Sequence, residues 1–124
     1  MTPLNLDSRQ LINGVLISVS GEIDTTNADQ LESFAGQVRR PGEPLVLDLS
    51  GLTFLDSTGL NVLLRLNSTA QEQGGGLHLA ALRKIPARLL KITGVDRAMQ
   101  IHANVDEAIA ALAASSAVPP ESAV

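Results

Sequence analysis

Residues 54–64, FLDSTGLNVLL, place an Asp-Ser-Thr-Gly segment between two apolar runs. The run before it, from Leu45 to Leu49, is short and bounded by turn-forming residues, as is typical of a buried strand. The run after it predicts a helix over about residues 58–73, with an inner side formed by Leu60, Leu63, Leu64 and Ala70. We therefore expect a strand, a tight turn and a helix, with Ser57 at the helix start.

Similar patterns predict the elements on either side of this unit. Asn13-Gly14 lies between two β-prone runs, at about 4–12 and 15–20, and favours a tight hairpin turn with positive φ angles. The next helix has its apolar residues at helical spacing: Ala28, Leu31, Phe34, Ala35 and Val38. Further strands are expected at 77–82 and 99–103, and further helices at 86–92 and 104–114.

The expected order of elements, β-β-α-β-α-β-α-β-α, defines an α/β protein. A hairpin followed by strand–helix alternation implies a mixed sheet of four to five strands, antiparallel at the N-terminal hairpin and parallel elsewhere. Right-handed crossovers then place the helices mainly on one face. The chain has 124 residues, enough for one domain. We expect that domain over residues 1–114 and a disordered tail over residues 115–124.

Composition excludes several classes of function. Aromatic residues make up 2% of the chain and the formal net charge is −4, so no direct nucleic-acid binding is expected. The absence of cysteine excludes disulfides, thiol catalysis and zinc–cysteine sites. The N-terminal residues lack a secretion-signal pattern, and no apolar run reaches the ~18 residues that a membrane helix needs. These observations predict a soluble cytoplasmic protein without membrane insertion.

Three features that resemble catalytic or ligand-binding sites have simpler explanations. His78 and His102, the only histidines, lack further ligands at metal spacing, so we expect no metal site and treat both as core or surface residues. Gly74–Gly76 lacks the Lys-Ser/Thr of a phosphate-binding loop and predicts a helix end. Ser57 lacks the Gly-x-Ser-x-Gly elbow and an evident base of a hydrolase. We therefore expect neither an enzyme nor a cofactor.

Ser57 itself allows two interpretations. At an N-cap position its hydroxyl would accept a backbone N–H bond and stabilise the helix by about 1 kcal/mol, a purely structural role. A helix N-terminus also tolerates the ~1.5–2 negative charges of a phosphate, which beside Asp56 would repel a docked partner. A helical wheel places Val62 near Thr58 and Arg65, away from the inner side. Val62 is therefore expected to be exposed, either as a docking residue or as an isolated surface valine.

Two segments resemble a known family. VLDLSGLTFLDSTGLNVLL, residues 46–64, is similar to the signature of STAS-domain anti-sigma factor antagonists, in which an apolar strand precedes Asp-Ser-[Ser/Thr]-Gly-Leu at a helix start. VSGEIDTTNADQL, residues 19–31, resembles the family's upstream Gly-Glu-[Ile/Leu]-Asp segment. The two motifs lie about thirty residues apart in the expected order, and the resemblance spans about residues 8–114.

The resemblance implies a phosphorylation switch. An unphosphorylated antagonist of this family binds an anti-sigma factor and frees a sigma factor. The anti-sigma factor is usually also a serine kinase, which uses its own ATP to phosphorylate the serine after the aspartate, here Ser57, and a separate phosphatase reverses the reaction. Asp24 and Asp56 match acidic positions near the family's partner-binding surface, whereas Asn61 departs from the small residue that often follows the motif. The expected partner-binding residues are Asp24, Asp56, Ser57, Thr58, Gly59, Asn61, Val62 and Arg65.

Two other classes of function fit parts of the sequence. One is a STAS subunit of a lipid-transport ABC complex or of a stress-signalling scaffold, in which Ser57 is structural; co-purifying proteins would distinguish it. The other is a small nucleotide-binding protein that holds phosphate at the helix N-terminus, although a Walker-type lysine is absent. Nucleotide binding by the purified chain alone would favour it. The sequence leaves the oligomeric state open.

Overall fold

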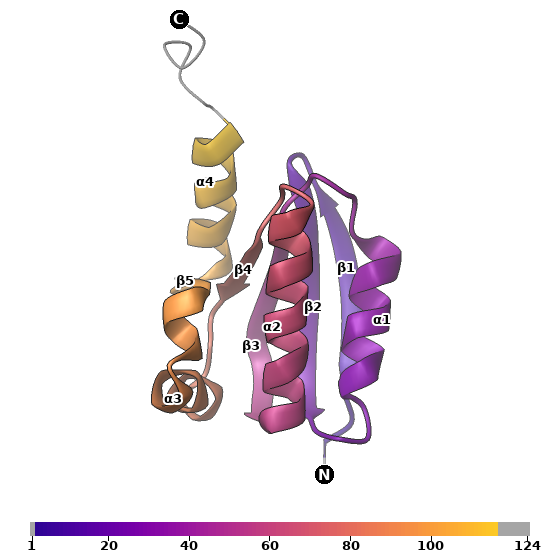
Figure 1. Cartoon of the computed structure of the whole chain (residues 1–124), viewed down its shortest axis with the longest axis vertical. Coiled ribbons are helices and arrows are strands. Elements are labelled where there is room, and N and C mark those ends of the chain that lie inside the picture. The colour runs from indigo at the N-terminus through magenta and orange to yellow at the C-terminus, as the bar shows by residue number, and fades with distance from the viewer. Residues whose placement is uncertain (1, 117–124) are drawn as a thin grey trace, which may run out of the picture.

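Five strands and four α-helices alternate along residues 2–116, the part of the chain that the computed structural model describes (Figure 1). The N-terminal hairpin consists of β1 (Asn5–Leu11) and β2 (Gly14–Ile23). The remaining elements, in chain order, are α1 (Ala28–Val38), β3 (Leu45–Leu55), α2 (Ser57–Glu72), β4 (Leu77–Ala80), α3 (Lys84–Thr93), the 3-10 helix η1 (Val95–Ala98), β5 (Gln100–His102) and α4 (Val105–Ser116).

All five strands lie in one sheet, in the order β1-β2-β3-β4-β5. β1 and β2 are antiparallel, whereas β2, β3, β4 and β5 are parallel to one another. The predicted mixed sheet with an antiparallel N-terminal hairpin is therefore confirmed. Because the last four strands run in one direction, their C-terminal ends lie at the same edge of the sheet. Ligands of open α/β sheets bind at this edge, and α2 begins there, directly after β3.

The hairpin turn differs from the prediction in its central residues. Ile12 and Asn13 occupy the turn, and Gly14 is already the first residue of β2. None of these three residues has a positive φ angle. Gly14 is required for space, because a Cβ atom there would lie 2.6 Å from the carbonyl oxygen of Pro44. Asn13-Gly14 thus predicted the hairpin correctly and its turn geometry wrongly.

The two faces of the sheet carry different numbers of helices. Side chains alternate along a strand, so Val15, Ile17 and Val19 of β2 point to one face and join the main core with residues of α1, α2 and α3. Leu16 points to the other face, in a smaller cluster under α4 with Val46, Ala80, Ala108 and Leu112. Three of the four helices therefore share one face, as expected. In Figure 1, α1 and α2 lie in front of the strands they cover.

Some element boundaries differ from those expected. β3 runs to Leu55 rather than Leu49, with shifts in its register to β2 after Ser18 and Gly21. α3 begins at Lys84, so Pro86 lies in its first turn, where a missing N–H breaks no helical bond. α4 reaches Ser116, so the first two residues of the expected tail are helical. The rest of that tail, residues 117–124, lies outside the described residues.

Candidate functional site

Asp56 caps the helix on which the candidate site is built. The residue is extended, and its Oδ1 accepts a hydrogen bond of 3.1 Å from the backbone N–H of Gly59. Its own backbone N–H donates to the carbonyl of Ile23 at the end of β2, at 3.2 Å. This aspartate therefore satisfies one of the free N–H groups of the first turn and anchors the helix start to the sheet. The expectation that Ser57 is the N-cap is wrong by one residue.

Ser57 is the first residue of α2 and its side chain is exposed. Because Asp56 already satisfies the N–H of Gly59, the serine hydroxyl is not needed to cap the helix. The backbone N–H groups of Ser57 and Thr58 have no preceding helical carbonyl to bond. The hydroxyl therefore lies at the positive end of the helix dipole, where a negative group is stabilised.

Gly59 faces the interior and not a docking surface. The residue is buried, and a Cβ atom there would lie 2.3 Å from Leu55 Cδ1 and 2.7 Å from Ile23 Cγ2. The absence of a side chain lets α2 pack closely against the ends of β2 and β3. Gly59 therefore helps to position Ser57. The sequence places Gly59 among the expected partner-binding residues, and the structure shows only that it is buried.

Val62 is also buried, with 0% of its surface exposed, so the expectation of an exposed docking residue is wrong. Thr58, Val62 and Arg65 follow one another along a single side of α2. Thr58 and Arg65 bond to residues of the loop before α1 and of α1 itself, so this side faces α1. The helical wheel assumed one buried side against the sheet. α1 also covers α2, so a larger part of the circumference of α2 is buried.

Asp24 lies at the same edge of the sheet, in the loop from β2 to α1, and this loop is held by its own polar side chains. Asp24 Oδ1 accepts bonds from the backbone N–H of Thr26, at 2.9 Å, and from its hydroxyl, at 2.5 Å. These bonds from Thr26 lower the pKa of the Asp24 carboxyl below its usual value. Asn27 Oδ1 accepts from the N–H of Asp24 at 2.9 Å, and its Nδ2 donates to the carbonyl of Glu22 at 2.9 Å.

A hydroxyl pair links this loop to the helix start. Thr25 Oγ1 and Thr58 Oγ1 lie 3.3 Å apart, at hydrogen-bonding distance. Asp24 and Asp56 follow the C-terminal ends of the adjacent strands β2 and β3, and Ser57 and Thr58 start α2 beside them. Asn61 lies one helical turn after Ser57, and Ser57 and Asn61 are the exposed residues of this set. Thr25 is not among the site residues predicted from the sequence. Its position directly after Asp24 in the second family-like motif was the available signal.

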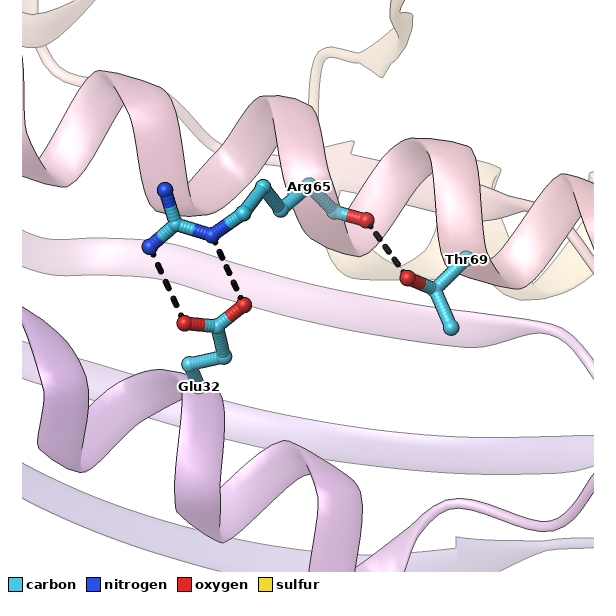
Figure 2. Close-up of polar contacts among 3 residues, drawn as sticks. All are labelled: Glu32, Arg65 and Thr69. Atoms are coloured by element: carbon cyan, nitrogen blue, oxygen red, sulfur yellow. Dashed lines mark hydrogen bonds and ion pairs between the residues drawn. The ribbon is translucent and has the colours of Figure 1, made fainter.

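Arg65 lies two helical turns from Ser57, about 12 Å along the axis, and is engaged with α1. Its guanidinium donates two hydrogen bonds to the Glu32 carboxylate, from Nε at 2.9 Å and from Nη2 at 3.0 Å (Figure 2). The bonds from Arg65 lower the pKa of Glu32, and the Glu32 carboxylate raises the pKa of Arg65. Thr69 Oγ1 donates to the Arg65 carbonyl at 2.9 Å on the same helix (Figure 2). The side chain therefore joins two helices.

The surface beside the helix start holds residues that were not anticipated. Phe54 is 42% exposed. It follows the register shift that leaves Thr53 unpaired with β2, and it points to the face opposite that of the buried Leu55. An open cleft of about 590 Å³ is lined by Thr53, Leu82, Arg83, Lys84 and Ile85. The sequence predicts that β3 ends at Leu49, so the exposure of Phe54 does not follow from that prediction.

The two histidines contact each other. His78 Nδ1 and His102 Nε2 lie 2.9 Å apart, and the rings stack with centroids separated by 5.2 Å. Burial lowers the pKa of His78, and the neighbouring His102 lowers it further. Within residues 2–116 no three His, Cys, Asp or Glu side chains are grouped as a metal site would require. No helix in the same range is both long and apolar enough to cross a bilayer.

Together the fold and the site define a small α/β domain that presents a serine at the start of a central helix. Comparison with known proteins gives its family. A model of the STAS domain matches residues 5–108. The anti-sigma-B factor antagonist of Bacillus subtilis (strain 168) is 32% identical over 100 residues, which cover 81% of this chain and 92% of that protein. The chain belongs to the STAS domain family.

Two further relatives share most of their length with this chain. The anti-sigma F factor antagonist of Paenibacillus polymyxa is 33% identical over 102 residues, which cover 80% of this chain and 87% of that protein. The crystal structure of an anti-sigma factor antagonist from Mycobacterium paratuberculosis is similar, with a TM-score of 0.80 and 28% identity. The match covers 89% of this chain and 94% of that one. The expected family and fold are therefore confirmed.

Proposed function

We propose that this protein is an anti-sigma factor antagonist, a binding regulator and not an enzyme, and that phosphorylation of Ser57 switches it off. The names of its relatives support the binding role, since those that match most of their own length are anti-sigma factor antagonists. The single observation that supports the switch is the exposed hydroxyl of Ser57 on a helix start that Asp56 already caps.

Addition of phosphate at Ser57 is compatible with the fold. The Ser57 side chain points to solvent, so a phosphate displaces no packed residue. The free N–H groups and the dipole at the start of α2 favour an anion there. Phosphorylation therefore acts on the docking surface and leaves the domain folded.

The same phosphate opposes binding of the partner. It adds about 1.5–2 negative charges next to the Asp56 carboxylate, on a surface that must lose its water when a partner docks. Moving a partner from almost fully bound to almost fully released takes about 5.5 kcal/mol of differential affinity. The burial of the phosphate charge and the steric exclusion of the partner both contribute to this difference in affinity. Both effects arise from the same phosphate group on the docking surface.

The proposed partner surface contains Asp24, Asp56, Ser57, Thr58 and Asn61. Gly59 and Val62 belong to the packing beneath it, and Arg65 lies at its border, held by Glu32. The proposed partners are an anti-sigma factor with serine kinase activity, which brings its own ATP, and a phosphatase that restores the free serine. No cofactor is assigned to this chain.

The test is a binding experiment with matched variants. Wild type, Ser57→Ala, Ser57→Asp and Ser68→Asp are used to capture proteins from the native cell, and bound proteins are identified by mass spectrometry. Ser68 is the control, because it is exposed on α2 about 16 Å further along the helix. Wild type, Ser57→Ala and Ser68→Asp are expected to capture an anti-sigma factor, and Ser57→Asp is expected to lose it.

The captured anti-sigma factor is then incubated with the wild-type chain and ATP. Mass spectrometry is expected to place one phosphate on Ser57 and none on the Ser57→Ala variant. Phosphate on another residue would contradict the switch while leaving the binding role intact. Capture of transport ATPase subunits, or of large assemblies of related domains, in place of an anti-sigma factor would contradict the binding role.

A further inference from the structure

β1 forms an outer edge of the sheet, and its backbone on that side is unpaired within residues 2–116. Its register to β2 runs without a shift from Asn5–Ser20 to Leu11–Gly14. The two-residue turn closes on the hydrogen-bonded pair Leu11–Gly14, and such pairs recur at every second residue of an antiparallel ladder. The odd-numbered residues of β1 therefore bond to β2. Leu6, Ser8 and Gln10 direct their N–H and C=O groups away from the sheet.

The side chains of this edge carry two charges of opposite sign. Asp7 and Arg9 are both exposed and, two residues apart, point to the same face of the sheet. Neither forms an ion pair among the residues that the structure describes, where the paired arginines are Arg40 and Arg65. Charges of one sign on an edge strand keep other strands away. Asp7 and Arg9 flank Ser8, one charge on each side. A second copy of β1 that pairs in antiparallel orientation can therefore place its Arg9 opposite Asp7 and its Asp7 opposite Arg9.

We propose that two copies of this chain pair through β1 in antiparallel orientation, with a two-fold axis at Ser8. In this register Ser8 lies opposite Ser8 of the second copy, and Leu6 lies opposite Gln10, so all the outward backbone groups find partners. Asp7 of each copy then lies opposite Arg9 of the other, in the close non-hydrogen-bonded type of pair. The two five-stranded sheets become one sheet of ten strands.

The charges select this register from its neighbours. A shift that keeps the outward backbone groups matched must move the two-fold axis by one residue, to Asp7 or to Arg9. An axis at Asp7 places two aspartates opposite each other, and an axis at Arg9 places two arginines opposite each other, which is destabilising. Only the axis at Ser8 converts both charges into cross-strand pairs. The interface is thus isologous, as in most homodimers.

The proposed dimer does not depend on the function assigned to Ser57. Ser57 starts α2, directly after β3, and β2 lies between β3 and the edge at β1. Both serines therefore stay open in the pair. The interface is small, seven strand residues from each copy, and belongs to the class that forms weak, concentration-dependent complexes.

The first experiment measures the dimer by sedimentation equilibrium of the purified chain, up to about 200 μM, a range suited to weak interfaces. We expect a monomer–dimer equilibrium in wild type. Asp7→Arg and Arg9→Asp, each alone, place like charges opposite each other at both symmetric positions and should weaken the dimer about tenfold. The double variant Asp7→Arg/Arg9→Asp restores opposite charges and should restore the dimer. Wild type that stays monomeric, or single variants that dimerise as wild type does, would overturn the proposal.

The second experiment uses substitutions that leave the charge unchanged. It therefore tests the proposed dimer even if the charge-reversal variants fail to fold. The protein has no cysteine, so Ser8→Cys introduces a single thiol. Opposite residues of a hydrogen-bonded pair have Cα atoms about 5.5 Å apart, within the roughly 4.4–6.8 Å of disulfides. In the proposed register the two copies of residue 5 lie about 20 Å apart. Mild oxidation should cross-link Ser8→Cys and leave Asn5→Cys monomeric; equal cross-linking of both, or of neither, would overturn the register.

Discussion

The guanidinium of Arg65 forms two parallel hydrogen bonds with the carboxylate of Glu32, at 2.9 and 3.0 Å, and so joins α2 to α1. Both side chains are partly accessible to water, 52% for Arg65 and 38% for Glu32. The pair is a surface contact between the helix that begins at Ser57 and the helix that follows the Asp24 loop. It links two residues that are thirty-three positions apart in the sequence, at the border of the candidate site.

We expect the Glu32–Arg65 pair to add little stability, because solvent screens exposed ion pairs. Glu32→Gln should lower the midpoint of thermal unfolding by no more than a few degrees at neutral pH. The pKa of Glu32 is lowered in the folded state, so its stabilising effect is present above its ordinary pKa of 4.5 and is lost as the pH falls through the lower folded value. Melting curves of wild type and Glu32→Gln should therefore converge in acid; a constant difference from neutral pH to pH 3 would contradict this.

Gly59→Ala is expected to destabilise the protein by about 1–3 kcal/mol. The added Cβ would meet Leu55 Cδ1 at 2.3 Å and Ile23 Cγ2 at 2.7 Å, and such overpacking outweighs the better helix propensity of alanine. Gly36→Ala is the matched control, because it lies within α1 and a Cβ there meets no atom within 4 Å. That substitution should stabilise by about 0.5–1 kcal/mol. Urea unfolding measures both, and equal effects would refute the packing argument.

Asp56→Ala removes the cap of α2 and should destabilise the protein by about 0.5–2 kcal/mol. Asp56→Asn keeps an oxygen that accepts the Gly59 N–H bond, so most of that loss should be absent. Comparison of the free energies of unfolding of wild type, Asp56→Ala and Asp56→Asn separates the contribution of the capping hydrogen bond from that of the carboxylate charge. If Asn were as destabilising as Ala, the carboxylate charge, rather than the hydrogen bond, would be the stabilising feature.

The strand–turn–helix unit, the hairpin and the order of elements along the chain were predictable because they depend on local sequence patterns. The buried arc of α2 was not, since it depends on where α1 packs. Asn67 shows the same limit. It falls within the apolar side of α2, and the sequence gives no reason for an amide there. In the structure it is buried, and its Nδ2 donates a 3.1 Å bond to the carbonyl of Ala98 in η1, an element that the sequence analysis did not anticipate.

The site was predictable to the same extent. Ser57, Asp56 and Asp24 meet at one edge of the sheet because they follow the C-terminal ends of adjacent parallel strands, as the alternation of elements implied. Whether Asp56 or Ser57 is the N-cap depends on the exact residue at which α2 begins. The spacing of apolar residues does not define a helix boundary to within one residue. The Thr25–Thr58 contact required the three-dimensional position of a loop.

A substitution at Val62 tests whether this residue is buried, as the structure shows, and not exposed, as the sequence predicts. Val62→Asp buries a carboxylate without a partner and should destabilise by more than about 3 kcal/mol, so the protein loses its fold before it loses a specific partner. Asn61→Asp, at the exposed neighbouring position, should change stability by less than about 0.5 kcal/mol. Circular dichroism during urea unfolding measures both. A folded Val62→Asp protein with near-normal stability would show that this side of α2 is open to solvent.

The burial of His78, next to His102, should make stability depend on pH below neutrality. The pKa of His78 is lowered in the folded state from its ordinary 6.5, chiefly by burial and then by His102, so the unfolded chain binds more protons than the native one in the interval between the two values. Stability therefore rises with pH through that interval and falls as the pH drops below about 6.5. His78→Val keeps an apolar group on β4 and removes this titration, so its urea midpoint should change less between pH 7 and pH 5 than that of wild type. An identical pH dependence in both proteins would mean that other groups control the acid response.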